Sequence, residues 1–214
     1  MTFFYLTAPI FLAYLIGSVP SAVWVGKLFH GIDVREHGSG NAGATNVIRV
    51  LGYKAGIPVL LFDVFKGWAA VQLVFLLPAD FCSPDTFVYI RIALALAAVS
   101  GHIFPVFAGF RGGKGVGTLA GVAIALFPIA LLVVLGAFIV VLAFTRYVSL
   151  ASIVAGFIFP FAVVFITGEC NTGLLLLSIL VAVFIPITHH KNIRRLIQRK
   201  ENKFDFRKKK KADF

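Results

Sequence analysis

Seven long apolar stretches fill most of the chain, and short polar stretches separate them. The apolar stretches cover residues 3–26, 56–78, 87–107, 115–127, 129–145, 147–168 and 172–188. A helix needs about 20 apolar residues to cross a bilayer, whereas the strands of a membrane barrel alternate apolar and polar positions. These stretches show no alternation, so the pattern predicts an all-α, polytopic membrane protein with about seven transmembrane helices.

Residues 116–144 are the difficult part of this pattern, because they are too many for one span and few for two. Pro128 lies near their middle, and proline interrupts the hydrogen bonding of a helix. We therefore predict a turn at Pro128. The first apolar stretch has no positively charged region before it, unlike a secretory signal, and we expect it to be retained as a span.

Composition agrees with this class of protein. Hydrophobic residues make up 59% of the 214 residues, and the mean hydropathy is +0.95. Soluble domains are only about 45–50% apolar. Charged residues amount to 14% of the chain, so most of its surface is predicted to meet lipid.

The positions of Lys and Arg predict the orientation, because cytoplasmic loops collect basic residues. Basic stretches alternate with stretches that contain none. Four basic residues lie in 27–55, two in 108–114, one at 146 and eleven after Thr188, and none lies in the N-terminal stub, in 79–86, at the 128 turn or in 169–171. The alternation predicts an outside N-terminus and a cytoplasmic C-terminus.

The basic residues after Thr188 form a polybasic segment beside the last apolar stretch. Such a segment binds anionic lipid headgroups, with about 1 kcal/mol per charge. No basic domain with interleaved aromatic residues accompanies it, so nucleic acid is not an expected partner. We divide the chain into a transmembrane domain, residues 1–196, and a polybasic cytoplasmic tail, residues 197–214.

The first cytoplasmic motif is a run of glycines and small polar residues followed by an arginine. Glycines let successive N–H groups point into one anion-binding concavity, and an arginine adds a planar fork for phosphate. The run satisfies G-x-G-x-x-G, but no strand precedes it, which excludes a dinucleotide-binding unit. The alternative is a flexible loop. The candidate phosphate-binding residues are Gly38, Ser39, Gly40, Asn41, Gly43, Thr45, Asn46 and Arg49.

A second glycine-rich segment, GFRGGKGVGT at residues 109–118, comes directly before the fourth apolar stretch. It is not a Walker A loop, because Gly115 follows Lys114 where that motif requires Ser or Thr. Glycine N–H groups and a lysine at a helix N-terminus still favour an anion. The candidate phosphate-binding residues of this segment are therefore Gly112, Gly113, Lys114 and Gly115. His102 either takes part in this site or is an interfacial residue at the end of the third span.

The third polar segment, THHKNIRRL at residues 188–196, follows the seventh apolar stretch. In a helix, His189, Asn192 and Arg195 would share one face, which would bring an imidazole and an amide within reach of a bound phosphate. The alternative is an interfacial flank that anchors the helix, and for Lys191 and Arg194 we prefer it.

Asp63 and Lys66 lie inside the second predicted span, where an ionisable residue is costly and faces the bundle interior. Their i, i+3 spacing permits an ion pair, which we interpret as structural support for the site. The sequence contains no two carboxylates placed like a DxxD-type metal cluster, no Cys/His spacing of a zinc site and no G-x-S-x-G elbow. We therefore expect no metal and no other cofactor.

Together these motifs resemble the bacterial acyl-phosphate-dependent glycerol-3-phosphate acyltransferase family (PlsY). The resemblance rests on GSGNAGATN with Arg49, LFDVFKG at 61–67, SGHIFPVFAGFRGGKGVGT at 100–118, RYVSLAS at 146–152 and HHKNIRRL at 189–196. The motifs occur in the family's order over all but the basic end of the chain. The His-x-x-x-x-Asp pair of acyl-thioester acyltransferases is absent after every histidine.

The resemblance implies an enzyme of phospholipid synthesis in the bacterial inner membrane, with its active site on the cytoplasmic side. It would transfer a fatty acyl group from acyl phosphate to the 1-hydroxyl of sn-glycerol 3-phosphate, giving lysophosphatidate and phosphate. By motif, Ser39, Arg49, Lys114, His189 and Asn192 would be catalytic. Either His189 or the donor's own phosphate would be the base.

One departure from the family concerns its last motif. His190 and Lys191 stand where the family usually has Arg and Glu, which puts in doubt any role of that glutamate in holding its neighbours. The loss of one carboxylate would also make the pocket more positive.

Two further alternatives stay open. An organophosphate or anion transporter would use the same loops, but it should carry ionisable residues near the midplane and repeated halves. Cys82 and Cys170 both fall in predicted outside turns. In an oxidising compartment they would either pair or remain as two thiols.

The predicted orientation can be tested with reporter fusions. A reporter fused at Asp80 should lie outside, and one fused after Arg199 should lie in the cytoplasm, because the Lys/Arg alternation places these positions on opposite sides. Paired reporters that are active on one side only would measure this. The same side for both fusions would contradict the predicted orientation.

Overall fold

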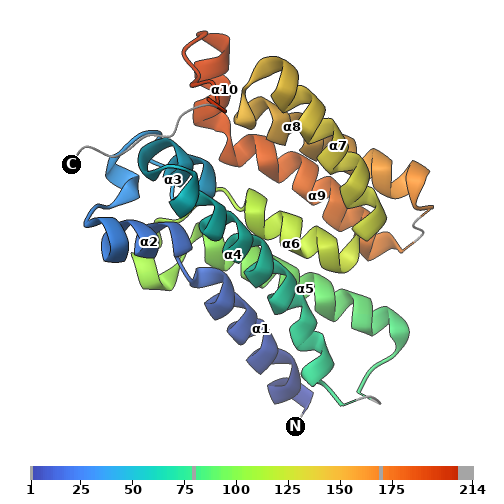
Figure 1. Cartoon of the computed structure of the whole chain (residues 1–214). Helices are drawn as coiled ribbons and strands as arrows, with labels where there is room; N and C mark the ends of the chain where they lie inside the picture. Colours follow the sequence, from blue (N-terminus) through green and yellow to red (C-terminus); the bar gives the residue numbers. More distant parts are fainter. Residues whose placement is uncertain (1, 79–80, 169–170, 207–214) are drawn as a thin grey trace. The chain divides into compact units, whose positions relative to one another are not determined.

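The computed structural model describes residues 2–78, 81–168 and 171–206, and within these ranges the secondary structure is helical throughout (Figure 1). The α-helices are α1 (Thr2–Ser18), α2 (Ser21–His30), α3 (Ala44–Leu51), α4 (Tyr53–Gln72), α5 (Pro84–Ile103), α6 (Val116–Leu126), α7 (Pro128–Thr145), α8 (Val148–Phe161), α9 (Thr172–Thr188) and α10 (His190–Ile197). Shorter 3₁₀ turns are η1 (Val34–Glu36), η2 (Leu73–Leu76) and η3 (Val106–Ala108), and η4 (Ala162–Ile166) is a π-helical turn. The all-helical class predicted from the sequence is confirmed.

Four helical segments of the described chain are long and apolar enough to cross a membrane, and two bent helix pairs would raise the number to six. The segments are Tyr53–Leu76, Pro84–Ala108, Pro128–Thr145 and Val148–Ile166. The turn predicted at Pro128 is present, because α7 begins there. Helix α6 has 11 residues, which span roughly 16 Å of a core about 30 Å thick. The seven-span topology therefore stays a prediction.

The first predicted stretch, 3–26, is divided into two helices with an angle of 42° between α1 and α2. The break falls at Val19 and Pro20, where proline lacks a backbone N–H and constrains the residue before it. Helix α2 also continues past the apolar stretch to His30 and ends at Gly31, which adopts the left-handed conformation. Periodicity alone did not indicate this break.

The described residues divide into two compact units, one up to Ala125 and one from Leu126 onward. In the first unit, α5 packs along α1, and α4 contacts both of them (Figure 1). In the second unit, α8 lies between α7 and α9. The predicted boundary at residue 196 separates a membrane domain from a tail, and it stays a prediction.

Glycines allow the helices of the first unit to approach backbone to backbone. A Cβ atom on Gly17 of α1 would collide with the carbonyl of Ala98 on α5, and one on Gly101 of α5 would collide with the carbonyl of Tyr14. The two contacts are reciprocal, so neither helix could move closer. In a membrane the hydrophobic effect does not drive helices together. Small residues at such positions permit the close van der Waals packing that does.

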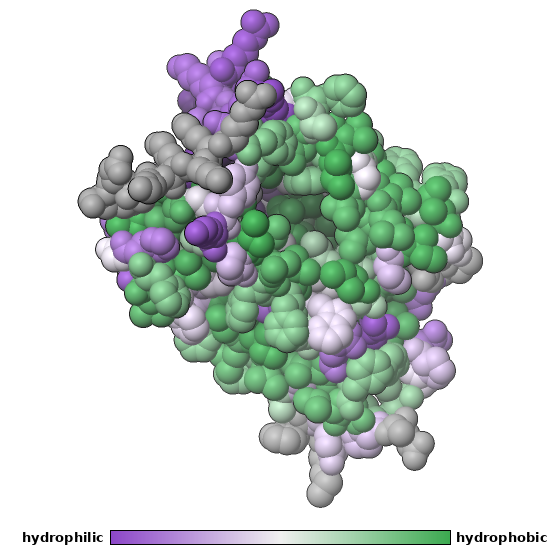
Figure 2. Space-filling model, viewed as in Figure 1, coloured by the Kyte–Doolittle hydropathy of each residue, from purple (hydrophilic) through white to green (hydrophobic). Residues whose placement is uncertain are grey.

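Large apolar side chains cover the outer surface of the helices (Figure 2). In α7 only Ala130 is buried, while Phe144 is 86% exposed. Such a helix would expose an apolar surface far larger than soluble proteins tolerate. The hydrocarbon core of a membrane is the solvent that suits it.

The α1–α5 packing generates a prediction on stability. Gly101→Val should lower the thermal unfolding temperature in detergent, because overpacking costs about 1–3 kcal/mol and here the clash is with the backbone. Gly136→Val is the matched control, because a Cβ at Gly136 meets no atom within 4 Å. Equal unfolding temperatures for the two variants would contradict the reciprocal contact.

Candidate active site

Ser39 lies in the connection between α2 and α3, residues 31–43, which we call the first loop. The glycines on either side of it adopt the left-handed conformation, with φ of 64° at Gly38 and 75° at Gly40. Both hydrogens that Ser39 can donate go to one acceptor, the Oδ1 atom of Asn46, at 2.7 Å from the backbone N and 3.0 Å from Oγ. The serine is therefore held in a defined position.

The side chain of Asn46 fixes the backbone of the first loop. Its Nδ2 donates to the carbonyls of Val34 at 2.8 Å and His37 at 3.1 Å, and the residue is 1% exposed. A buried amide with all of these groups satisfied is a structural support. The predicted role of Asn46 as a phosphate ligand has no support from this geometry, whereas a role in shaping the loop does.

The start of α3 carries a run of backbone N–H donors. No hydrogen bond within the described residues involves the backbone N–H groups of the five residues from Asn41 to Thr45. Gly43 caps the helix without a side chain, so the positive end of the helix dipole faces the first loop. Arg49 follows Thr45 by four residues and lies on the same helix face. These amides and this arginine are suited to a phosphate group.

The second loop, residues 104–115, connects α5 to α6 and carries Lys114. The N–H of Gly112 donates to the carbonyl of Ile103 at 3.0 Å, and that of Gly113 donates to the carbonyl of His102 at 3.2 Å. A Cβ atom on either glycine would collide with His102. These two glycines are thus required by packing, and their predicted role as phosphate donors has no support from this geometry.

The two loops touch at their bases. A Cβ atom on Gly113 would lie 2.8 Å from the carbonyl oxygen of Ala42, so the backbones meet directly before Lys114. Gly115 follows with φ of 82°, and α6 begins at Val116. The first unit therefore brings the Ser39 loop and the Lys114 loop together.

A buried polar cluster lies beneath the second loop. Asp63 and Lys66 form the predicted ion pair at 2.8 Å, with side chains 4% and 2% exposed. Ser21 Oγ donates to Asp63 at 2.8 Å, and Lys66 Nζ donates to the carbonyl of Val19 at 2.9 Å. The ring of His102 is buried, with Nδ1 3.7 Å from Asp63, so His102 is not an exposed interfacial residue.

The third polar segment belongs to the second unit, where α9 and α10 meet at an angle of 60°. His189 lies at this junction and is buried. Its Nδ1 lies 2.8 Å from the carbonyl oxygen of Ile185, and a carbonyl only accepts, so Nδ1 carries the hydrogen. The neutral ring then has its lone pair on Nε2, as a general base requires.

Glu201 was not indicated by the sequence analysis. Its Oε1 accepts from Asn192 Nδ2 at 2.7 Å and from Ser149 Oγ at 3.0 Å, and its Oε2 lies 3.2 Å from Arg195 Nε. Asn192 and Arg195 therefore share one face of α10, as predicted. The available signal was an acid within the basic tail, where Glu201 is the only Glu after Thr188.

Two further predictions concern a metal site and the two cysteines. Within the described ranges no cluster of three or more His, Cys, Asp or Glu residues could hold a metal ion. Cys82 forms no disulfide within the described ranges, and Cys170 lies outside them, so the two alternatives for these cysteines stay predictions.

The sequence profile described as Glycerol-3-phosphate acyltransferase matches residues 7–199. A glycerol-3-phosphate acyltransferase of Fusobacterium nucleatum is 46% identical over 198 residues, which cover 92% of this chain and 97% of the relative. That of Chlorobaculum tepidum is 42% identical over 226 residues, covering 94% and 97%.

The fold is similar to crystal structures of PlsY, an integral membrane glycerol 3-phosphate acyltransferase. The TM-score is 0.83 for the glycerol 3-phosphate form and 0.80 for the lysophosphatidic acid form, each at 34% identity. The similarity covers 94% of this chain in both cases, and 96% and 95% of the other chains.

The contacts of Glu201 generate a stability prediction. Glu201→Ala should lower the thermal unfolding temperature in detergent, because it leaves the Asn192 amide and a nearby guanidinium without their carboxylate. A hydrogen bond to a charged group contributes roughly 1.5–3 kcal/mol. Glu201→Gln keeps one acceptor and should be affected less. An Ala variant as stable as the parent would show that the carboxylate does not hold α10.

Proposed function

This chain belongs to the glycerol-3-phosphate acyltransferase family, and we propose that it transfers a fatty acyl group from acyl phosphate to the 1-hydroxyl of sn-glycerol 3-phosphate. The observation that carries the proposal is the run of backbone amides at the start of α3 with Arg49 on the same helix face. A glycerol phosphate and an acyl phosphate both present a phosphate to the protein, and both call for such donors.

The reaction needs little covalent chemistry from the protein. The 1-hydroxyl oxygen attacks the acyl carbon, a new ester C–O bond forms, and the bond from the acyl carbon to the phosphate oxygen breaks. The products are lysophosphatidate and inorganic phosphate. Since the mixed anhydride already has a good leaving group, positioning and charge stabilisation are the main contributions of the enzyme.

We assign roles to residues of the three motifs from their chemistry. Arg49 and Lys114 stabilise the phosphate charge, and Ser39 Oγ, whose own hydrogen is donated to Asn46, accepts from a substrate hydroxyl. His189 takes the hydroxyl proton on Nε2, which its bond to the Ile185 carbonyl supports. Asn192 contributes an amide for a substrate oxygen, and Glu201 fixes the orientation of this amide.

We place the active site on the cytoplasmic side of a bacterial inner membrane. The Lys/Arg distribution supports this side, and the apolar outer surface of the helices supports a position in lipid. The acyl donor has a long apolar chain, so an active site at the boundary of lipid and cytoplasm would receive both substrates.

The activity assay uses purified protein in detergent with acyl phosphate and glycerol 3-phosphate, following phosphate and lysophosphatidate. Lys114→Ala and Arg49→Ala should each lower turnover by about two to three orders of magnitude, because loss of one group that stabilises developing charge costs roughly 3–4 kcal/mol. Each variant should elute as folded protein on size exclusion.

Lys191→Ala is the matched control, because this lysine is exposed on α10 and is assigned to the lipid surface. Its turnover should equal that of the parent. Near-normal turnover in both Lys114→Ala and Arg49→Ala would refute their assignment to the phosphate groups, and inactive parent protein would refute the proposed reaction.

A further inference from the structure

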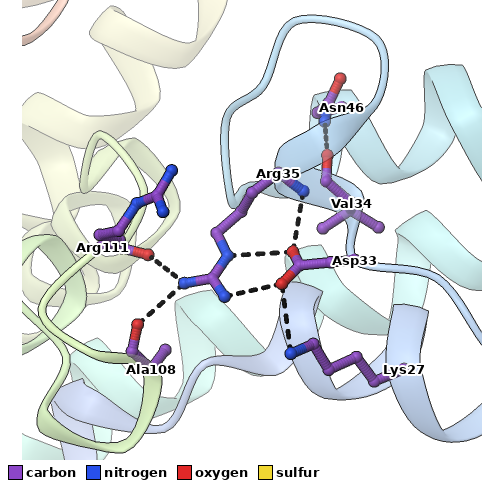
Figure 3. A network of polar contacts seen from close by, with 7 residues as sticks. All are labelled: Lys27, Asp33, Val34, Arg35, Asn46, Ala108 and Arg111. Atoms are coloured by element: carbon purple, nitrogen blue, oxygen red, sulfur yellow. Dashed lines mark hydrogen bonds and ion pairs between the residues drawn. The ribbon is translucent and has the colours of Figure 1, made fainter.

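Arg35 lies in η1, within the first loop, and pairs with Asp33 through one edge of its guanidinium (Figure 3). Nε donates to Oδ1 at 2.9 Å and Nη2 donates to Oδ2 at 2.7 Å, a bidentate arrangement. The backbone N–H of Arg35 also donates to Oδ1, at 3.0 Å. The two side chains are only 15% and 11% exposed, so the arginine is fixed in orientation.

The remaining nitrogen of Arg35 reaches the second loop (Figure 3). Nη1 donates to the carbonyl of Ala108 at 2.8 Å and to the carbonyl of Arg111 at 3.2 Å. These acceptors are 73 and 76 residues away along the chain. One guanidinium therefore bridges the loop that carries Ser39 and the loop that carries Lys114.

A few bonds or residues connect each end of this bridge to a candidate site residue. On one side, Val34 precedes Arg35 and its carbonyl is bonded to Asn46, which holds Ser39 (Figure 3). On the other side, Arg111 lies three residues before Lys114. The residues between them, Gly112 and Gly113, are bonded to the end of α5.

We propose that Arg35 is a positioning residue that fixes the separation between Ser39 and Lys114 for phosphate binding. It acts through the backbone of the second loop and does not touch the substrate. The inference rests on the proposed function, because it assumes that these two residues serve one reaction. A displacement of about 1 Å in such a group can cost a hundredfold in rate.

The ion pair of Asp33 and Arg35 keeps its charges over a wide range of pH. The hydrogen bond from Arg35 holds the pKa of Asp33 well below its usual range, and the same bond raises the pKa of Arg35. The carboxylate therefore stays ionised down to strongly acidic pH. Lys27 also approaches Asp33, at 3.3 Å, but its side chain is 54% exposed and such pairs contribute little.

A lysine cannot replace Arg35 in this position. Its single ammonium could pair with Asp33 or reach one carbonyl, but it lacks the planar fork that does both at once. Arg35→Lys therefore keeps the charge and removes the bridge. Lys27→Ala is the matched control, because it removes a cation from the same carboxylate without affecting the second loop.

The experiment measures kcat and KM for glycerol 3-phosphate, with acyl phosphate as donor, and the thermal unfolding temperature in detergent. Arg35→Lys and Arg35→Ala should lower kcat about ten- to a hundredfold, with a smaller change in KM, and should unfold near the parent temperature. Added guanidinium should restore activity to Arg35→Ala, whereas ammonium at the same concentration should not. Lys27→Ala should behave as the parent.

Parental kcat in a folded Arg35→Lys variant would overturn the inference while leaving the proposed function intact. A loss of activity in that variant that only matches its loss of folded protein would also overturn it. If Arg35→Ala does not fold, Arg35→Lys decides alone. Parent protein without acyltransferase activity would overturn the inference and the proposed function together.

Discussion

The buried ion pair of Asp63 and Lys66 is the contact on which the first unit depends. Removing two charges from water costs several kcal/mol for each, and only close pairing with further hydrogen bonds offsets that cost. Here the further bonds go to the break between α1 and α2, through the Val19 carbonyl and the Ser21 hydroxyl. The bond from Lys66 also serves the Val19 carbonyl at the helix break, where a backbone polar group needs a partner within the protein because lipid offers none.

The position of the first loop follows from this break. Because the chain turns at Pro20, α2 leaves the direction of α1 and buries Ala22 against Val34 and Val47, in the small core under the loop. On the other side of the pair, Gly117 packs against the Asp63 side chain, because a Cβ atom on Gly117 would lie 3.1 Å from the Cβ of Asp63. His102, beside the same aspartate, supports Gly113. One pair of opposite charges thus underlies both loops.

The sequence predicted the parts of the structure that local patterns determine. Most of the long helices coincide with the apolar stretches, Pro128 marks a turn, and the i, i+3 spacing of Asp63 and Lys66 gives the ion pair. Contacts between distant residues were not predictable in this way. The hydrogen bond from Asn46 to Val34 and the bridge from Arg35 to the second loop join segments that no local pattern connects.

Glycines illustrate the same limit. In the sequence, Gly112 and Gly113 have the composition of an anion-binding loop, and their flexibility favours that interpretation. The structure uses their lack of a side chain to bring the second loop against His102 and Ala42. A glycine therefore indicates a close approach, but the sequence alone does not identify whether the approaching atom belongs to a ligand or to the protein.

The departure from the family's last motif can now be interpreted. Lys191 replaces the usual glutamate, which raised the question of what carboxylate would hold Asn192. In this chain residues 190 and 191 are exposed, whereas the Asn192 amide faces inward to Glu201 at 2.7 Å. The substitution therefore changes the charge of the surface of α10 and leaves the support of Asn192 intact.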